Sequence, residues 1–152
     1  MRNRTIIAVT KDAEWLIGMR PVLHGSGGNR VVVAESVEEA ERLLDFAQPR
    51  MVVVDGKPEA CGADAIAGLL WKNSTQGRPA SVMIVADDYR IDEATLMFRL
   101  GVDEYVGGVE HRDALAAVMT ALAPASQPRR SRPVAEPTAE IAAVPTPVAA
   151  AS

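Results

Sequence analysis

Asp55 is the residue of this chain that is best placed to do chemistry. It ends the apolar run Met51-Val-Val-Val54, which predicts a buried strand, and a loop with Pro58 and Gly62 follows it. A carboxylate at such a strand end can act as a nucleophile, ligate a cation or pair with a basic side chain. The residue types and spacing leave these three roles open.

Further polar residues follow two other strand-like runs. They are Thr10, Lys11 and Asp12 after the first run, and Asp87 after the fourth. In a parallel sheet the carboxyl ends of the strands meet at one edge, and ligands bind there. We therefore expect these side chains to lie near Asp55.

Five short apolar runs, rich in β-branched residues, predict strands that are buried on both faces. The runs cover residues 5–9, 30–34, 51–54, 81–86 and 104–106. Helical patterns separate them, and the helices are expected from about residue 12, after the capping box Ser36–Glu39, around 66–70, over 91–100 and over 115–122. Pro21 is expected to kink or shorten the first helix.

This alternation predicts an α/β fold, a doubly wound five-stranded parallel sheet of the flavodoxin-like type. From Pro124 the periodic pattern stops, and prolines are scattered among alanine, serine, threonine and valine. We therefore expect one domain over residues 1–123 and a disordered Pro/Ala-rich tail over 124–152.

Composition excludes several classes of function. The formal net charge of −4 argues against a general nucleic-acid binder, and no apolar run is long enough to span a membrane. The single cysteine, Cys61, cannot form an internal disulfide, and Cys and His spacing indicates no metal cluster. A cytoplasmic protein without nucleic-acid or membrane contacts is the expectation.

Two segments carry a family resemblance. The run that ends in Asp55, with its Pro- and Gly-containing loop, resembles the phosphoacceptor segment of bacterial response-regulator receiver domains, the CheY-like family of two-component systems. The segment Leu100-Gly-Val-Asp-Glu-Tyr-Val106 is similar to the family's entry into its fifth strand, with Tyr105 as the switch aromatic. The resemblance covers residues 4 to about 123 and implies receiver topology.

The resemblance also implies a phosphorelay chemistry. In the family the strand-end Asp accepts a phosphoryl group from a histidine kinase, and an acidic pair after the first strand holds Mg²⁺. A Ser or Thr after the fourth strand and a Lys after the fifth bind the phosphoryl oxygens. Asp55 is the matching acceptor position, and Asp12 with Asp55 would be the Mg²⁺ ligands if this chemistry were kept.

The other pocket positions depart from the family pattern. The acidic pair aligns with Thr10 and Lys11, with Asp12 one residue beyond. The hydroxyl position is Ala86, followed by Asp87, and the lysine position is Gly108. These departures predict a pseudoreceiver that binds no cofactor and takes up Mg²⁺ poorly. They also suggest that Lys11 pairs with Asp55 in place of the metal.

We therefore expect a signalling module, not an enzyme, that acts by phosphorylation-independent protein–protein interaction. The expected contact surface is the face formed by the fourth helix, the fifth strand and the fifth helix, with a possible homodimer. Candidate contact residues are Met97, Arg99, Tyr105 and Arg112. The alternative is a response regulator that a histidine kinase phosphorylates at Asp55.

Overall fold

The computed structural model describes residues 4–25, 28–57, 62–108 and 117. Five strands form one sheet in the order β2-β1-β3-β4-β5, and every neighbouring pair is parallel. The strands are β1 (Thr5–Val9), β2 (Arg30–Ala34), β3 (Met51–Asp55), β4 (Ser81–Ala86) and β5 (Glu104–Gly107). The helices are α1 (Ala13–His24), α2 (Val37–Ala47), α3 (Ala63–Ser74) and α4 (Ile91–Leu100). The predicted fold class is confirmed.

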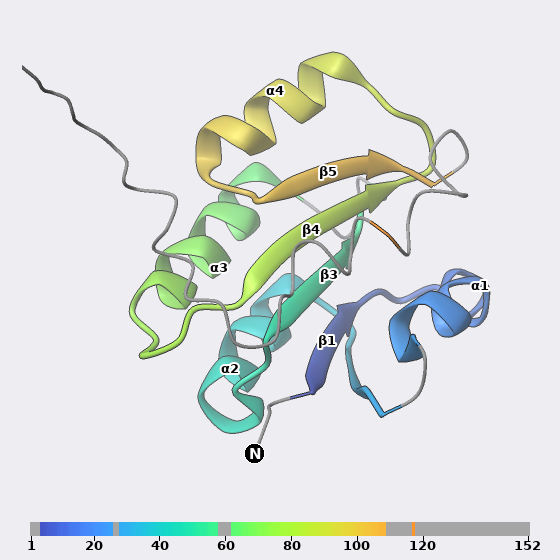
Figure 1. Ribbon diagram of the computed structural model, residues 1–152. Coiled ribbons are helices and arrows are strands. Elements are labelled where there is room, and N and C mark those ends of the chain that lie inside the picture. Colours follow the sequence, from blue (N-terminus) through green and yellow to red (C-terminus); the bar gives the residue numbers. More distant parts are fainter. Residues whose placement is uncertain (1–3, 26–27, 58–61, 109–116, 118–152) are drawn as a thin grey trace, which may run out of the picture.

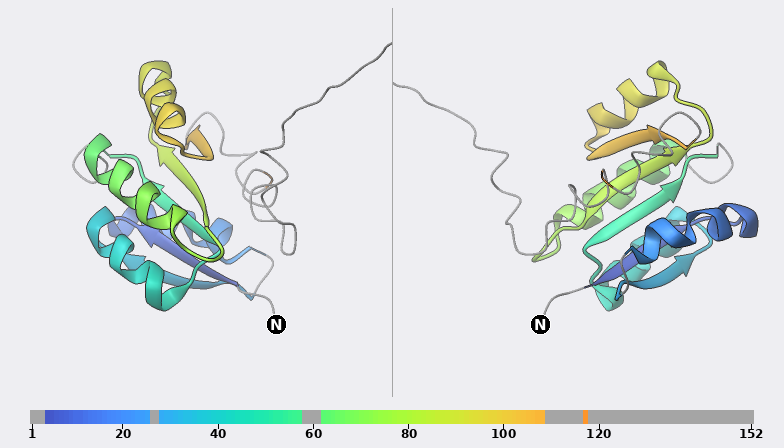
Figure 2. Two further views of the ribbon diagram at one scale, coloured as in Figure 1. Left: turned by 90° about the vertical axis from the view of Figure 1, so that its left-hand side faces the viewer. Right: turned by 45° about the vertical axis from the view of Figure 1, so that its right-hand side comes forward.

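Helices cover both faces of the sheet. Figure 1 and Figure 2 show α2, α3 and α4 on one face and α1 on the other. Every residue of β1, β3 and β4 is buried, as the continuous apolar runs predict for inner strands of a parallel sheet. β2 is an edge strand, and its burial is correspondingly incomplete.

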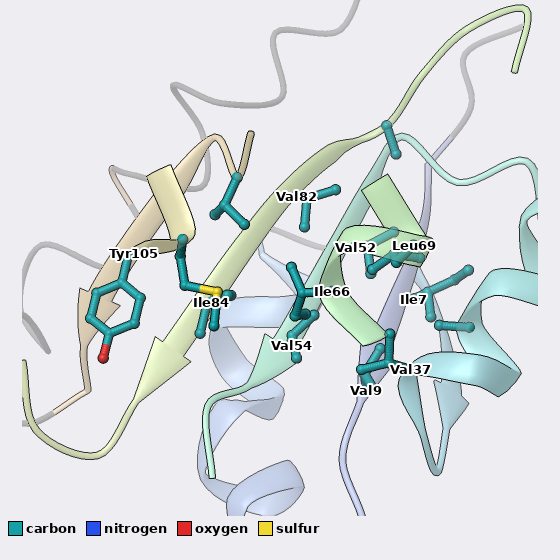
Figure 3. Close-up of a cluster of buried hydrophobic side chains, with 14 of the residues drawn as sticks. Ile7, Val9, Val37, Val52, Val54, Ile66, Leu69, Val82, Ile84 and Tyr105 are labelled. Atoms are coloured by element: carbon teal, nitrogen blue, oxygen red, sulfur yellow. The ribbon is translucent and has the colours of Figure 1, made fainter. Parts of the chain in front are cut away.

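Alternate strand residues divide the core into two layers. The larger layer lies under α2, α3 and α4, and Figure 3 shows its row of side chains from Ile7 through Val52 and Ile84 to Tyr105 at one end. The smaller layer lies under α1 and includes Ile6, Met51 and Met83. The two layers fix the sheet, because a shift of one residue in any strand would exchange them.

Helix α1 corrects one expectation. Pro21 lies inside the helix, which continues to His24 and is capped at Gly25, so the proline does not end it. Asp12 is the N-cap, and its Oδ1 accepts a 2.9 Å hydrogen bond from the Glu14 N–H. This cap places the Asp12 carboxylate just beyond the end of β1.

Two other helix ends follow the sequence signals. Ser36 caps α2, and its Oγ accepts a 3.0 Å hydrogen bond from the Glu39 N–H. The Glu39 side chain reaches back to the N–H of Glu35, one residue before the cap. Helix α4 has the predicted bounds and ends at Gly101, whose φ of 116° is left-handed and suits glycine.

Several predictions lie outside the described residues. They are the last helix over 115–122, of which only position 117 is described, the domain boundary at 123, the tail and Arg112. Across the described part of the chain, no helix combines the length and apolar character needed to cross a membrane.

Candidate functional site

The ends of four strands meet where the sequence analysis expects the site. Val9 is in register with Val54, so Thr10 follows β1 beside the end of β3. Asp55 is in register with Val85, and Ala86 with Gly107. The sheet therefore brings together residues that are up to about a hundred positions apart in sequence.

Asp55 is held by Thr10. The Thr10 hydroxyl donates a 2.6 Å hydrogen bond to Asp55 Oδ2, and the same oxygen of Thr10 accepts from the Asp12 N–H at 3.0 Å. Both side chains are buried, with Asp55 1% exposed and Thr10 3% exposed. A buried carboxylate needs such a donor, because an unpaired one is costly.

Lys57 supplies the positive charge. Its Nζ lies 3.1 Å from Asp12 Oδ2 and 3.8 Å from Asp55 Oδ1. A third carboxylate, Asp87 Oδ1, is also 3.8 Å away. The backbone N–H of Lys57 donates a 3.3 Å hydrogen bond to Asp55 Oδ1, so both Asp55 oxygens are engaged.

The expected pair between Lys11 and Asp55 is wrong. Lys11 is exposed, and none of the ion pairs within the described residues involves it. Lys11 directly precedes Asp12, the N-cap of α1, whereas the backbone N–H and the Nζ of Lys57 both lie near Asp55 Oδ1. Sequence reasoning missed Lys57, although a lysine two residues after the strand-end acid was a usable signal.

The pKa shifts follow from this arrangement. Burial raises the pKa of Asp55 above its ordinary 3.8, and outweighs the Thr10 hydrogen bond and the attraction of Lys57. For Lys57, burial lowers the pKa, but the hydrogen bond to Asp12 and the nearby carboxylates outweigh it and leave the pKa above 10.5. The hydrogen bond from Lys57 holds the pKa of Asp12 below 3.8. The pocket therefore keeps Lys57 charged.

Near the ends of β4 and β5, the contacts around the pocket are made by backbone atoms. A Cβ on Gly56 would lie 2.9 Å from Ala86 Cα, so the ends of β3 and β4 are in direct contact. The Gly108 N–H donates a 2.6 Å hydrogen bond to the Ala86 carbonyl oxygen. Ala86 and Gly108 offer no side-chain hydroxyl or cation at these two strand ends.

The residues present do not fit a magnesium ion as they stand. Mg²⁺ requires octahedral oxygen ligation at about 2.0–2.1 Å. Here an ammonium lies among the Asp12, Asp55 and Asp87 oxygens that such an ion would use. Within the described ranges, no three carboxylate, histidine or cysteine side chains are grouped to hold a metal.

Two of the four candidate contact residues are not on the surface. Met97 and Tyr105 are each 2% exposed, because both point into the larger core layer. Arg99 is exposed, and Arg112 lies outside the described residues. Helix α4 exposes three large apolar side chains that the sequence analysis did not name, and these are Ile91, Leu96 and Phe98.

Tyr105 links β5 to α4. Its hydroxyl donates a 3.1 Å hydrogen bond to Glu93 Oε1, and Glu93 also forms an ion pair with Arg90. The Tyr89 ring packs edge-on against the Tyr105 ring, with centroids 5.4 Å apart. Burial and the bond to Glu93 raise the pKa of Tyr105 to about 12. The aromatic ring is thus fixed in the inward position.

Solved structures share this architecture. A LuxR-family two-component response regulator from Aurantimonas sp. SI85-9A1 matches 75% of this chain and 85% of its own at 24% identity, with a TM-score of 0.58. The phosphorylated cyanobacterial phytochrome response regulator RcpA matches 79% and 94% at 15% identity, with a TM-score of 0.63. This is the receiver fold.

A CheY-like response regulator receiver domain protein from Methanospirillum hungatei JF-1 is also similar to this chain. It covers 78% of this chain and 93% of its own, at 17% identity and a TM-score of 0.61. No protein-family model matches the sequence, and no curated protein sequence is significantly similar to it. At these identities the likeness concerns the fold, and the chemistry of the pocket must be judged from its own residues.

Proposed function

We propose that this chain is a signalling module on a receiver scaffold that works through protein contacts and without phosphorylation of Asp55. The observation that carries the proposal is the state of Asp55 itself. Its Oδ2 accepts from the Thr10 hydroxyl, and its Oδ1 accepts from the Lys57 N–H.

The surroundings of Asp55 support this proposal. A phosphoryl group carries two negative charges, which a site must offset with cations and hydrogen-bond donors. Ala86 and Gly108 offer no such side chains. Lys57 would have to offset the charge of the phosphoryl group, and Asp87 already places a negative charge 3.8 Å from its Nζ. A phosphoryl group on either Asp55 oxygen would also disturb an existing hydrogen bond, from Thr10 to Oδ2 or from the Lys57 N–H to Oδ1.

The contact surface is proposed to be the side of the domain formed by α4 and β5. Ile91 is 71% exposed and Phe98 is 43% exposed, and Arg99 on the same helix is exposed too. Exposed apolar side chains next to a charged one are typical of protein contact surfaces. The partner is accordingly a protein with an apolar patch and an acidic residue.

Treatment with acetyl phosphate or phosphoramidate and Mg²⁺, read by intact mass, tests the phosphorylation part. No gain of one phosphoryl group is expected, and Asp55→Asn is the matched control. A gain in the wild type that Asp55→Asn abolishes would support the alternative, a phosphorelay regulator that a histidine kinase phosphorylates.

Cross-linking in the native host tests the contact surface. Wild type and Asp55→Asn should capture the same partner, and Phe98→Glu should lose it while keeping its thermal midpoint. Arg42→Glu, on the exposed side of α2, is the control for a surface charge change. Loss of the partner in Asp55→Asn alone would contradict a phosphorylation-independent contact.

A further inference from the structure

The cation among the strand-end carboxylates is an ammonium of the chain itself. Lys57 Nζ is 3.1 Å from Asp12 Oδ2, and 3.8 Å from one oxygen each of two further aspartates. These three acceptors follow or end β1, β3 and β4. We propose that Lys57 takes the place of a divalent cation in this pocket and keeps such ions out.

This inference deepens the proposed function and rests on its account of the pocket. An ion-binding measurement tests it, whereas a phosphoryl mass tests the proposed function. If the wild-type pocket binds a metal ion but is not phosphorylated, only the inference about Lys57 is contradicted. If Asp55 is phosphorylated without a metal ion, only the proposed function is contradicted.

All four carboxylate oxygens of Asp12 and Asp55 already have interaction partners. Asp55 Oδ2 accepts from Thr10, and Asp12 Oδ1 accepts from the Glu14 N–H that begins α1. The remaining oxygens of these two carboxylates, Asp12 Oδ2 and Asp55 Oδ1, both face Lys57. An incoming ion would have to displace the ammonium or lie beside it, and two cations a few ångströms apart repel each other.

The covalent tether favours the lysine over a free ion. Lys57 lies two residues after Asp55, and its own N–H donates to Asp55 Oδ1, which fixes the start of the side chain beside the carboxylate. A group tethered in this way acts at a high effective concentration. A divalent ion at millimolar concentration must also lose part of its hydration shell to enter.

Removal of the ammonium leaves carboxylates that can regroup. The side chain of Asp55 is 2% exposed, whereas those of Asp12 and Asp87 are 34% and 66% exposed. Asp12 Oδ2 and Asp87 Oδ1, which now face the ammonium, are expected to turn toward Asp55 once Lys57 is shortened. These oxygens would then offer the hard donor set that Mg²⁺ and Mn²⁺ prefer.

Titration with MnCl₂, followed by electron paramagnetic resonance of the free ion, tests the inference on the full chain. Wild type should show no saturable binding at millimolar Mn²⁺. Lys57→Ala should bind one Mn²⁺ at least tenfold more tightly, and Mg²⁺ should compete for it. Lys57→Arg, which keeps the charge, should behave as wild type.

Two controls separate the pocket from general charge. Lys11→Ala removes the same charge from an exposed position and should leave Mn²⁺ binding unchanged. Asp12→Asn added to Lys57→Ala should abolish the gain. Lys57→Gln, with a neutral side chain of similar shape, gives a second variant if the alanine variant does not fold.

Three results would overturn the inference. One is saturable Mn²⁺ binding by the wild type at submillimolar concentration. This result alone would contradict the inference, regardless of how the variants bind Mn²⁺. Another is a folded Lys57→Ala or Lys57→Gln variant with no gain in binding. The third is an equal gain in Lys11→Ala, which would mean that overall charge, and not the position of Lys57, controls the ion.

Discussion

The hydroxyl of Thr10 and the Oδ2 atom of Asp55 are joined by a 2.6 Å hydrogen bond between the ends of β1 and β3. Thr10→Val removes the donor and leaves a buried carboxylate oxygen unpaired, which should lower the free energy of unfolding by about 1–3 kcal/mol. Urea unfolding measures this. Thr10→Ser keeps the hydroxyl and should cost less. Equal losses in Thr10→Val and Thr10→Ser would contradict a role for the hydroxyl.

The raised pKa of Asp55 predicts a pH-dependent difference between wild type and Asp55→Asn. A group with a raised folded pKa contributes stability that is fully present below its unfolded value, 3.8, and is lost as pH rises through the folded pKa. Asn does not ionise. The stability of Asp55→Asn relative to wild type should therefore rise with pH from 3.8 upward and then level off, as measured by urea unfolding across a pH series.

Asp12 should show the opposite trend, and serves as the control. Its pKa is lowered by Lys57, so its stabilising contribution is present above 3.8 and is lost as pH falls through the folded pKa. Relative to wild type, Asp12→Asn should therefore lose stability as pH rises toward 3.8. The same trend in both variants would mean that Lys57 does not distinguish the two carboxylates.

The Tyr105 hydroxyl should lose its proton at a higher pH than an ordinary tyrosine. The chain has two tyrosines, and burial with the Glu93 hydrogen bond raises the pKa of Tyr105 to about 12. Ultraviolet titration should show a component near that pH which Tyr105→Phe removes and Glu93→Gln shifts downward. The stability that protonated Tyr105 contributes is fully present below pH 10 and is lost as pH rises through about 12.

Gly56 should tolerate no side chain. A Cβ there would lie 2.9 Å from Ala86 Cα, which is backbone and cannot move aside alone. Gly56→Ala should therefore lower the free energy of unfolding by about 1–3 kcal/mol, as overpacking does. Gly77→Ala is the matched control, because nothing lies within 4 Å of its Cβ position. Equal stability of the two variants by thermal unfolding would refute the close contact of β3 and β4.

The sequence was sufficient for the fold class. Continuous β-branched runs mark strands that are buried on both faces, and the helices between them impose parallel crossovers, so a doubly wound parallel sheet follows from local pattern and chirality. The order of its strands was implied only by the resemblance of two segments to receiver domains. The Ser36 cap of α2 and the Gly101 end of α4 were readable too, because each is satisfied within a few residues. The expectation that Pro21 would shorten α1 was wrong, since α1 continues past it to His24.

For the candidate site too, the sequence determined one part and the tertiary structure another. Residue type and strand order determined that Asp55 lies at the carboxyl edge of the sheet, because a strand end has only one place in this topology. Tertiary structure alone decided which lysine faces it. Lys11 and Lys57 both follow strand ends, yet Lys11 is exposed and Lys57 lies beside the Asp12, Asp55 and Asp87 carboxylates. Which lysine reaches these carboxylates depends on packing between segments distant in sequence, which residue spacing does not encode.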